Sequence, residues 1–178
     1  MSLAIDMLGG GQIGFFTGWL ATQDHRDKLR GFTSSLATRG RRLTIGPVVE
    51  AHDDEDEACR RTREILRAYP RLKGVYISTS NSVPVLRAAE AEGRLADLTV
   101  VATDLFPDLA EWIRAGKVLA TVYQRPLTQG RIALQTLYQF LRTGHVPEPR
   151  HRVVPYLVMR SNLELALERL AIRQPAKV

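Results

Sequence analysis

The chain has 178 residues, of which 44% are apolar and 25% are charged, and its formal net charge is +6. This composition is typical of a globular protein with one domain and a packed core. No apolar run approaches the roughly 18 residues of a membrane-spanning helix, so no membrane association is expected. The N-terminus is a poor signal peptide, and the single Cys59 excludes an internal disulfide. These features predict a cytoplasmic location.

The basic charge raises the question of nucleic-acid binding, because a pI near 9.9 is common among such proteins. The arginines are spread over four separate segments, 39–42, 60–67, 125–131 and 150–152. No helix-turn-helix, zinc-finger or RNA-recognition signature accompanies them, and aromatic residues do not alternate with them as stacking platforms would. The sequence therefore does not predict direct nucleic-acid binding by this chain.

Apolar runs of strand type alternate along the chain with segments that carry apolar residues on one helical face. In chain order they predict a strand over 12–17, a helix over 24–39 and a strand over 43–50. A helix follows the acidic cluster 52–57 and ends at Pro70. Next come a strand over 74–78, a helix over 82–92 and a strand over 98–102. The remaining predicted elements are a helix over 107–115, a strand over 118–123, a helix over 126–142, a strand over 153–158 and a helix over 161–170. This alternation predicts an α/β fold, an open parallel sheet with helices on both faces.

Three motifs suggest chemistry but have the wrong context. Gly9, Gly11 and Gly14 match G-x-G-x-x-G, yet they lead into a strand instead of following one. The acids of 52–57 point in different directions around a helical turn and suit the helix dipole better than a metal. Asp24 and His25 are adjacent, so the carboxylate is poorly placed to orient the imidazole of a triad that would use Ser34 or Ser78. We therefore predict no metal, no cofactor and no catalytic residues.

The segment 98–109 places a carboxylate directly after a predicted buried strand. Asp104 follows the strand 98–102, and ligand groups in parallel sheets lie at this carboxyl edge. Asp104 could instead cap the helix that begins near Pro107, because aspartate is a favoured capping residue. The residues alone leave both interpretations open.

Polar or aromatic side chains follow several other predicted strands, and a parallel sheet would bring them to one edge. Carboxylate, guanidinium and amide groups with an aromatic ring suit a neutral polyhydroxylated ligand, and no nucleophile with its base accompanies them. We therefore predict binding without turnover, so the protein is not expected to be an enzyme. The candidate ligand-binding residues are Thr17, Arg26, Ser80, Asn81, Asp104, Phe106 and Gln124.

Six motifs in this order carry a resemblance to a known family. They are G-Q-I-G-F-F-T-G, H-R-D-K-L-R-G-F, G-V-Y-I-S-T-S-N, V-V-A-T-D, A-T-V-Y-Q-R-P-L-T-Q-G-R-I-A-L and Y-L-V-M-R-S-N-L. Together they resemble the effector-binding module of lac-repressor-family transcription regulators, which is similar to type I periplasmic sugar-binding proteins. The resemblance spans about residues 11–163, and the last motif is more similar to the regulators than to the transport proteins.

The resemblance assigns roles to individual residues. Asp104 corresponds to the family's sugar-binding aspartate and Gln124 to its cross-lobe glutamine. The family's arginine corresponds to Arg26, although Lys28 is an alternative position for it. The family's asparagine corresponds to Asn81 or, in a shifted alignment, to Ser80.

The resemblance also implies a domain organisation. Residues 11–123 correspond to the second lobe of a two-lobed module, 124–150 to a crossover helix that packs on the first lobe, 151–170 to a closing strand and helix, and 171–178 to a tail. The DNA-binding headpiece and most of the first lobe are missing, so we expect a fragment or a mis-started reading frame, with weak ligand affinity. Operator DNA would be contacted only through that headpiece. The apolar stripe Ala133, Leu137, Phe140 and Leu141 would lose its partner, which favours a homodimer.

The sequence thus predicts the effector-binding lobe of a lac-repressor-family regulator, with a sugar or sugar derivative as the small-molecule effector. Two alternatives stay open. One is a fragment of a periplasmic sugar-binding protein of the transporter type. The other is a doubly wound α/β enzyme.

Overall fold

The computed structural model describes residues 10–39 and 42–171, so Gly9 of the glycine motif and residues 172–178 of the predicted tail lie outside the described chain. Strands and helices alternate in the order predicted, within a few residues at their ends. The strands are β1 (Gly11–Thr17), β2 (Leu43–Glu50), β3 (Leu72–Ile77), β4 (Thr99–Thr103), β5 (Ala120–Tyr123) and β6 (Tyr156–Met159). The helices are α2 (Gln23–Arg39), α3 (Glu55–Ala68), α4 (Ser82–Ala91), α5 (Pro107–Arg114), α6 (Pro126–Thr143) and α7 (Leu163–Ala171), with short 3₁₀ turns η1 (Leu95–Asp97) and η2 (Arg160–Asn162).

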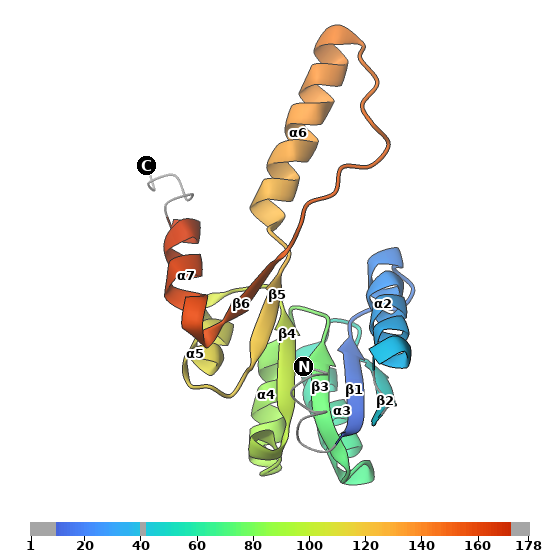
Figure 1. Cartoon of the computed structure of the whole chain (residues 1–178), viewed down its shortest axis with the longest axis vertical. Helices are drawn as coiled ribbons and strands as arrows, with labels where there is room; N and C mark the ends of the chain where they lie inside the picture. The colour runs from blue at the N-terminus through green and yellow to red at the C-terminus, as the bar shows by residue number, and fades with distance from the viewer. Residues whose placement is uncertain (1–9, 40–41, 172–178) are drawn as a thin grey trace.

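The six strands form one sheet in the order β2-β1-β3-β4-β5-β6. The first five are parallel, but β6 is antiparallel to β5. The prediction of strands that all run in one direction is therefore wrong for the last strand. After α6 the chain returns along 144–155 to the edge where β5 ends (Figure 1). It enters the sheet there without crossing it, so β6 must run the opposite way.

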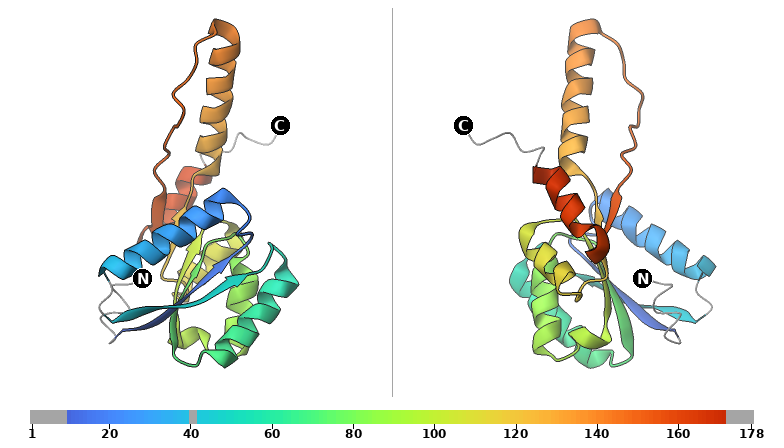
Figure 2. Two further views of the ribbon diagram at one scale, coloured as in Figure 1. Left: turned by 90° about the vertical axis from the view of Figure 1, so that its right-hand side faces the viewer. Right: turned by 60° about the vertical axis from the view of Figure 1, so that its left-hand side comes forward.

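Helices cover both faces of the sheet, as the alternation predicts. α3, α4 and α5 cover one face, α2 covers part of the other, and α7 packs beside α5 (Figures 1 and 2). The larger core cluster lies under α3, α4 and α5 and includes Leu66, Leu86 and Ile113. A smaller cluster of Ile13, Leu36 and Leu43 lies under α2. Burial of these side chains is the main stabilising contribution, at roughly 1.5–3 kcal/mol for each large one.

α6 and the returning segment 144–155 project away from the rest of the molecule as an arm (Figures 1 and 2). The helix has 18 residues, and none of them is buried. An open groove of about 950 Å³ separates it from the returning segment, lined by residues such as Ala133, Phe140 and Val146. The predicted apolar stripe is divided, because Ala133, Leu137 and Phe140 face this groove and Leu141 is not among its lining residues.

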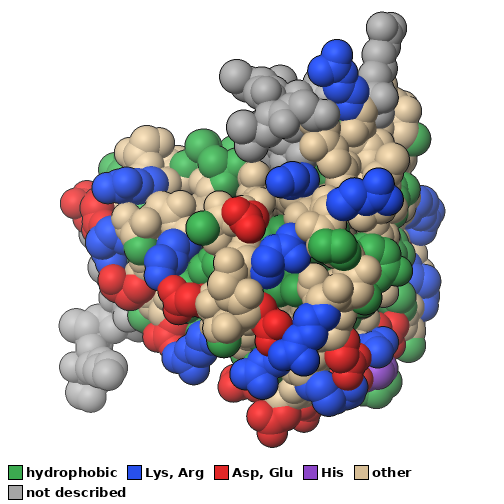
Figure 3. Space-filling view, turned by 90° about the horizontal axis from the view of Figure 1, so that it is seen from below, with side chains coloured by type: hydrophobic (Ala, Val, Ile, Leu, Met, Phe, Trp, Pro, Cys, Tyr) green, Lys and Arg blue, Asp and Glu red, His purple; other side chains and the backbone are tan. Residues whose placement is uncertain are grey.

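Charged side chains are mixed in sign on the face of the molecule opposite the arm (Figure 3). Many arginines form ion pairs, among them Arg67 with Glu92 and Arg114 with Glu164, whose N–O distances are 2.7 and 2.8 Å. Within residues 10–39 and 42–171, no helix is long and apolar enough to cross a membrane. The same residues include no group of three or more His, Cys, Asp or Glu side chains that could hold a metal ion.

Candidate ligand-binding site

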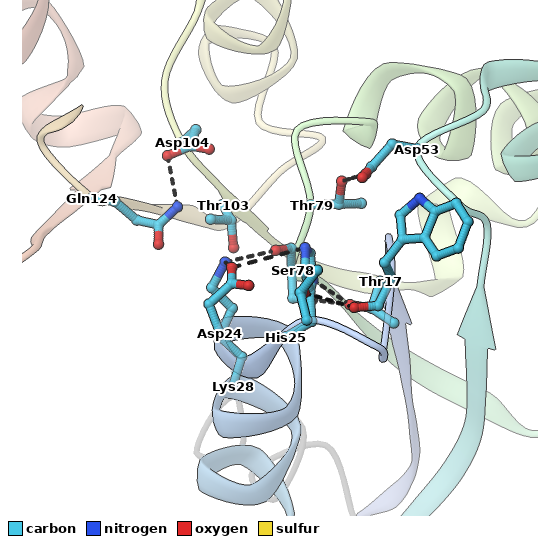
Figure 4. A network of polar contacts seen from close by, with 12 residues as sticks. Thr17, Asp24, His25, Lys28, Asp53, Ser78, Thr79, Thr103, Asp104 and Gln124 are labelled. Carbon is cyan, nitrogen blue, oxygen red and sulfur yellow. Dashed lines mark hydrogen bonds and ion pairs between the residues drawn. The ribbon is translucent and has the colours of Figure 1, made fainter. Parts of the chain in front are cut away.

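The carboxyl ends of the five parallel strands meet at one edge of the sheet, and polar side chains gather there (Figure 4). Asp104 follows β4 and Gln124 follows β5. Thr17 ends β1, Ser78 follows β3, and Asp53 belongs to the loop after β2. The first turns of α2 reach the same edge. The parallel direction of neighbouring strands is what brings these distant positions together.

Asp104 and Gln124 form a direct pair. The Gln124 Nε2 donates a hydrogen bond of 3.1 Å to Asp104 Oδ1. Asp104 has a positive φ of 70°, a left-handed conformation that aspartate tolerates better than most residues. Its backbone N–H donates to Val122 O at 3.0 Å, and its carbonyl accepts a hydrogen bond from the Thr121 hydroxyl. The end of β5 therefore holds the turn that directs this carboxylate toward Gln124.

The capping alternative for Asp104 is wrong. α5 begins at Pro107 with Phe106 at the N-cap position, and no side chain caps its N-terminus. The fixed φ of proline suits the first helical position without a cap. Phe106 itself packs against the main core cluster.

A second group of side chains joins β1, β3 and α2. Thr17 is fully buried, and its Oγ1 lies 2.6 Å from His25 Nδ1 in a hydrogen bond. The Ser78 hydroxyl donates to Thr17 Oγ1 at 2.9 Å. Lys28 donates to the Ser78 carbonyl at 3.2 Å and to Asp24 Oδ2 at 3.3 Å. These contacts fix the N-terminal half of α2 against the edge of the sheet.

Arg26 does not join this group. Its guanidinium donates to the carbonyls of Leu20 and Ala21, at 2.8 and 2.6 Å, and to Gln23 Oε1 at 3.1 Å. It therefore stabilises the turn before α2. Of the two cations that the sequence left as alternatives, Lys28 is the one that the structure places beside Ser78.

Of the two residues considered after β3, Asn81 contacts the edge through its backbone N–H, which donates to Thr79 Oγ1 at 3.5 Å. Asn81 is the N-cap residue of α4, but its side chain makes no cap hydrogen bond, and its Nδ2 is buried without a partner among the described residues. Ser80 is exposed. The structure instead places Thr79 at this edge, where its hydroxyl donates to Asp53 Oδ1 at 2.6 Å.

Three side chains at this edge, Tyr76, Thr79 and Thr103, were not among the candidate ligand-binding residues. A pocket of about 180 Å³ brings together Lys28, Tyr76, Thr103 and Gln124, and the Thr103 hydroxyl donates to the Tyr76 hydroxyl at 3.3 Å. Thr103 directly follows the predicted strand 98–102, and Thr79 follows β3. Their positions at the carboxyl ends of strands could have marked both residues as candidates. Tyr76 lies within a strand, where no sequence signal marks it.

At this edge the Asp24 carboxylate is paired with a cation, whereas Asp104 forms no ion pair among the described residues. Partial burial of Asp24 opposes ionisation, but hydrogen bonds and the charges of His25 and Lys28 together lower its pKa. The Asp24 carboxylate therefore faces the Lys28 ammonium as an ion pair. Burial raises the pKa of Tyr76, so this phenol stays protonated. Asp104 has only the Gln124 amide as a side-chain partner among the described residues, which leaves a carboxylate able to accept hydrogen bonds from hydroxyl groups.

The loop between β2 and α3 is held by His52. Its Nε2 lies 2.9 Å from Glu50 and its Nδ1 2.9 Å from Glu57, and the Trp19 ring contacts it edge-on at 4.7 Å between centroids. His52 and Asp53 both have left-handed backbone conformations, with φ of 49° and 56°. The hydrogen bond to Glu57 is the main cause that raises the pKa of His52; desolvation opposes it, and the charges of Glu57 and Glu50 with the hydrogen bond to Glu50 add to the rise.

The raised pKa predicts a pH-dependent stability. A protonated His52 stabilises the folded state fully below its ordinary pKa of 6.5, and this contribution is lost as the pH rises through the higher folded-state value. We expect the melting temperature of the wild type to exceed that of His52→Gln below pH 6.5, with the difference shrinking as the pH is raised through the folded-state pKa. Thermal unfolding across this range measures it. A difference that grows with pH would contradict the assignment.

Comparison with known proteins identifies the family to which the chain belongs. Residues 1–145 match the family model described as periplasmic binding protein domain. The chain belongs to the periplasmic binding protein domain family. Its α/β sheet is that of the type I periplasmic-binding-protein fold, as predicted.

Solved structures of similar fold agree with this domain over most of its length. A glucose-galactose binding protein, GanP, from Geobacillus stearothermophilus matches with a TM-score of 0.83 and 20% identity, over 91% of this chain and 57% of that chain. A Caulobacter myo-inositol binding protein matches with a TM-score of 0.83 and 22% identity, over 92% of this chain and 57% of that chain.

Among curated proteins, the D-allose-binding periplasmic protein of Escherichia coli (strain K12) is 24% identical to this periplasmic binding protein domain over 148 residues. The match covers 82% of this chain and 47% of that protein. The chain thus spans about half the length of the curated relative that it matches.

Proposed function

We propose that this domain binds a neutral sugar or polyol, without converting it, as one lobe of a binding protein of the transporter-linked kind. The observation that carries the proposal is the Asp104–Gln124 pair at the carboxyl edge of a parallel sheet. A carboxylate that accepts and an amide that both donates and accepts can satisfy adjacent hydroxyl groups of one ring. Lys28, on the same small pocket as Gln124, supplies a further donor.

The geometry does not favour an enzyme. The constellation closest to a nucleophile and base is Ser78, Thr17 and His25, and the side chains of Ser78 and Thr17 are fully buried. A substrate would have to reach these hydroxyls for covalent chemistry. Their hydrogen bonds instead join β1, β3 and α2, which is a structural role.

The names of the similar proteins support the transporter-linked proposal over the regulator predicted from the sequence. They are described as binding D-allose, glucose-galactose and myo-inositol, the first of them as a periplasmic protein. The ending Y-L-V-M-R-S-N-L favoured the regulator. In the structure its Asn162 accepts from Met159 N at 2.7 Å and donates to Leu157 O at 3.1 Å, so it holds a turn. That role is structural and would serve either class.

The regulator remains the second candidate, on the resemblance of that ending. It would act in the cytoplasm and contact operator DNA through a headpiece. A helix-turn-helix segment encoded ahead of residue 1 in the gene would favour the regulator, whereas a signal peptide there would favour the periplasmic binding protein.

The proposal is tested by titrating the ¹⁵N-labelled chain with D-allose, D-glucose and myo-inositol in NMR. We expect saturable shifts around Asp104 and Gln124 for at least one of them, with affinity in the millimolar range because a single lobe supplies only part of the contacts. Addition of buffer without any sugar and titration with a sugar phosphate serve as the two comparisons. Shifts confined to other surfaces, or conversion of the added sugar, would contradict the proposal.

A matched pair of variants tests which cation contributes to binding. Lys28→Met is expected to weaken sugar binding about tenfold or more, because a hydrogen bond from a charged donor contributes about 1.5–3 kcal/mol. Arg26→Met removes a cation two residues away that donates only to Leu20, Ala21 and Gln23, so its affinity should stay within about twofold of wild type. The same titration measures both. Equal losses would contradict the placement of Lys28 in the site.

A further inference from the structure

The hydrogen bonds that join Ser78, Thr17 and His25 run in one direction (Figure 4). The Ser78 hydroxyl donates to Thr17 Oγ1 at 2.9 Å, and Thr17 Oγ1 lies 2.6 Å from His25 Nδ1. A hydroxyl group has a single proton to donate, and both hydroxyl residues are fully buried. Because Ser78 already uses its proton toward Thr17, the Thr17 proton goes to His25. The run of donors therefore ends at Nδ1, which has to accept.

The direction of these hydrogen bonds fixes the protonation of the ring. A nitrogen that accepts a hydrogen bond carries no proton, so neutral His25 carries its proton on Nε2. A second proton on Nδ1 would leave one buried hydroxyl without an acceptor among the described residues, and an unsatisfied buried donor is costly. The three side chains are therefore fully hydrogen-bonded only while His25 is neutral. We refer to Ser78, Thr17 and His25 as the hydroxyl relay.

We propose that neutral His25 is a positioning residue for the sugar, because it holds Lys28 at the carboxyl edge of the sheet. This inference rests on the proposed function for the identity of the ligand. Ser78 links the two residues, since its hydroxyl begins the relay to His25 and its carbonyl accepts from Lys28 Nζ at 3.2 Å. His25 and Lys28 are three residues apart in α2, so they are neighbours on one side of the helix. Loosening of His25 therefore loosens Lys28.

The charged groups around His25 lie on its own helix and farther along the edge. Asp24 Oδ2 is 3.8 Å from His25 Nε2 and 3.3 Å from Lys28 Nζ, so one carboxylate faces both side chains. Other ionisable groups at the edge are paired or hydrogen-bonded elsewhere, namely Arg26, Glu50, His52, Asp53, Glu57 and Asp104. The strands β1 and β3 present the hydroxyl groups of Thr17, Ser78 and Tyr76, and burial raises the pKa of the Tyr76 phenol.

Protonation of His25 has two effects on this arrangement. It adds a positive charge that competes with Lys28 for the Asp24 carboxylate, an effect that water weakens because the Asp24 side chain is 62% exposed. It also breaks the hydroxyl relay, where burial leaves no water to replace the lost hydrogen bond. Both effects release Lys28 from its place beside Ser78. Sugar affinity is therefore expected to fall as the pH is lowered.

The pH dependence of sugar binding tests the role of His25. NMR titrations with D-allose, D-glucose and myo-inositol are run at about pH 8 and at about pH 5, the range in which ordinary histidines change charge. We expect the wild type to bind at least about fivefold more weakly at the lower pH. Asp24 stays ionised over this range because its pKa is lowered.

Three variants separate His25 from other causes of a pH dependence. His25→Asn places an amide oxygen close to the position of Nδ1, so it keeps an acceptor for Thr17 that cannot be protonated. It should bind sugar more tightly than His25→Phe, which has no acceptor, and without a pH dependence. His52→Gln removes the other histidine near the edge and should keep the wild-type pH dependence. A pH-independent wild type, or a His25→Asn variant as pH-dependent as the wild type, would overturn the proposal.

Spectra without sugar separate a failure of this inference from a failure of the proposed function. Long-range ¹H–¹⁵N NMR should show a proton on Nε2 of His25 and none on Nδ1 at about pH 8, and the opposite tautomer would overturn the proposal. The Lys28 side-chain resonances should shift as His25 is protonated in the wild type and stay constant in His25→Asn. Circular dichroism at both pH values checks that each variant is folded. If these spectra are as expected and none of the three sugars binds at either pH, the proposed function is wrong while the hold of His25 on Lys28 stands.

Discussion

Replacing Asp104 by alanine is expected to remove detectable sugar binding from the domain. The carboxylate is a charged hydrogen-bond acceptor that forms no ion pair among the described residues, and it is positioned by the end of β5, through Val122 O and the Thr121 hydroxyl. Loss of a charged acceptor for ligand hydroxyls costs about 1.5–3 kcal/mol, which is roughly 10–100-fold in affinity. For a ligand already in the millimolar range, saturation would no longer be reached in an NMR titration.

The conservative control for this prediction is Asp104→Asn. It keeps a side chain that tolerates the left-handed backbone at this position, where φ is 70°. We expect Asp104→Asn to retain the fold and to bind more weakly than wild type but more tightly than Asp104→Ala. If Asp104→Ala binds as well as the wild type while Gln124→Ala does not, the carboxylate is not the ligand group and the site must be reassigned.

The second large effect is expected from Phe15→Ala, which should destabilise the domain by about 3–5 kcal/mol. Phe15 is fully buried, with ring centroids 5.3 Å from Phe32 of α2 and 5.4 Å from Tyr76 of β3. Truncation leaves a cavity under α2 and removes two aromatic contacts at once. A loss of this size is a large part of the 5–15 kcal/mol that is typical of a folded domain.

Urea denaturation followed by circular dichroism measures this prediction. Phe15→Leu keeps most of the volume and should cost under about 1.5 kcal/mol. Because Tyr76 and the first turns of α2 border the candidate site, sugar binding by the folded Phe15→Ala chain should also weaken. A destabilisation of less than about 1 kcal/mol for Phe15→Ala would show that α2 is not anchored to the sheet by this aromatic cluster.

Which cation reaches the sheet edge could not be read from the sequence. In α2 the apolar residues Leu29, Phe32 and Leu36 mark the side that packs on the sheet. Lys28 and Arg26 lie on opposite flanks of this stripe, about 160° apart around the helix. Only the direction in which α2 crosses the sheet decides which flank meets the carboxyl edge. The same holds for Tyr76, whose place in a strand resembles that of any aromatic core residue.

The sequence by itself determined the alternation of strands and helices, because period-2 and period-3.6 apolar patterns are local properties of the chain. It also predicted that Asp104 and Gln124 lie at the same edge of a parallel sheet, whereas the pairing of β4 with β5 that lets them touch comes from the tertiary structure. The tertiary structure alone decided that β6 runs antiparallel, that Lys28 and not Arg26 reaches the edge, and that α6 stands clear of the described core. Each of these depends on how an element is oriented against residues distant in the sequence, and no local pattern encodes that orientation.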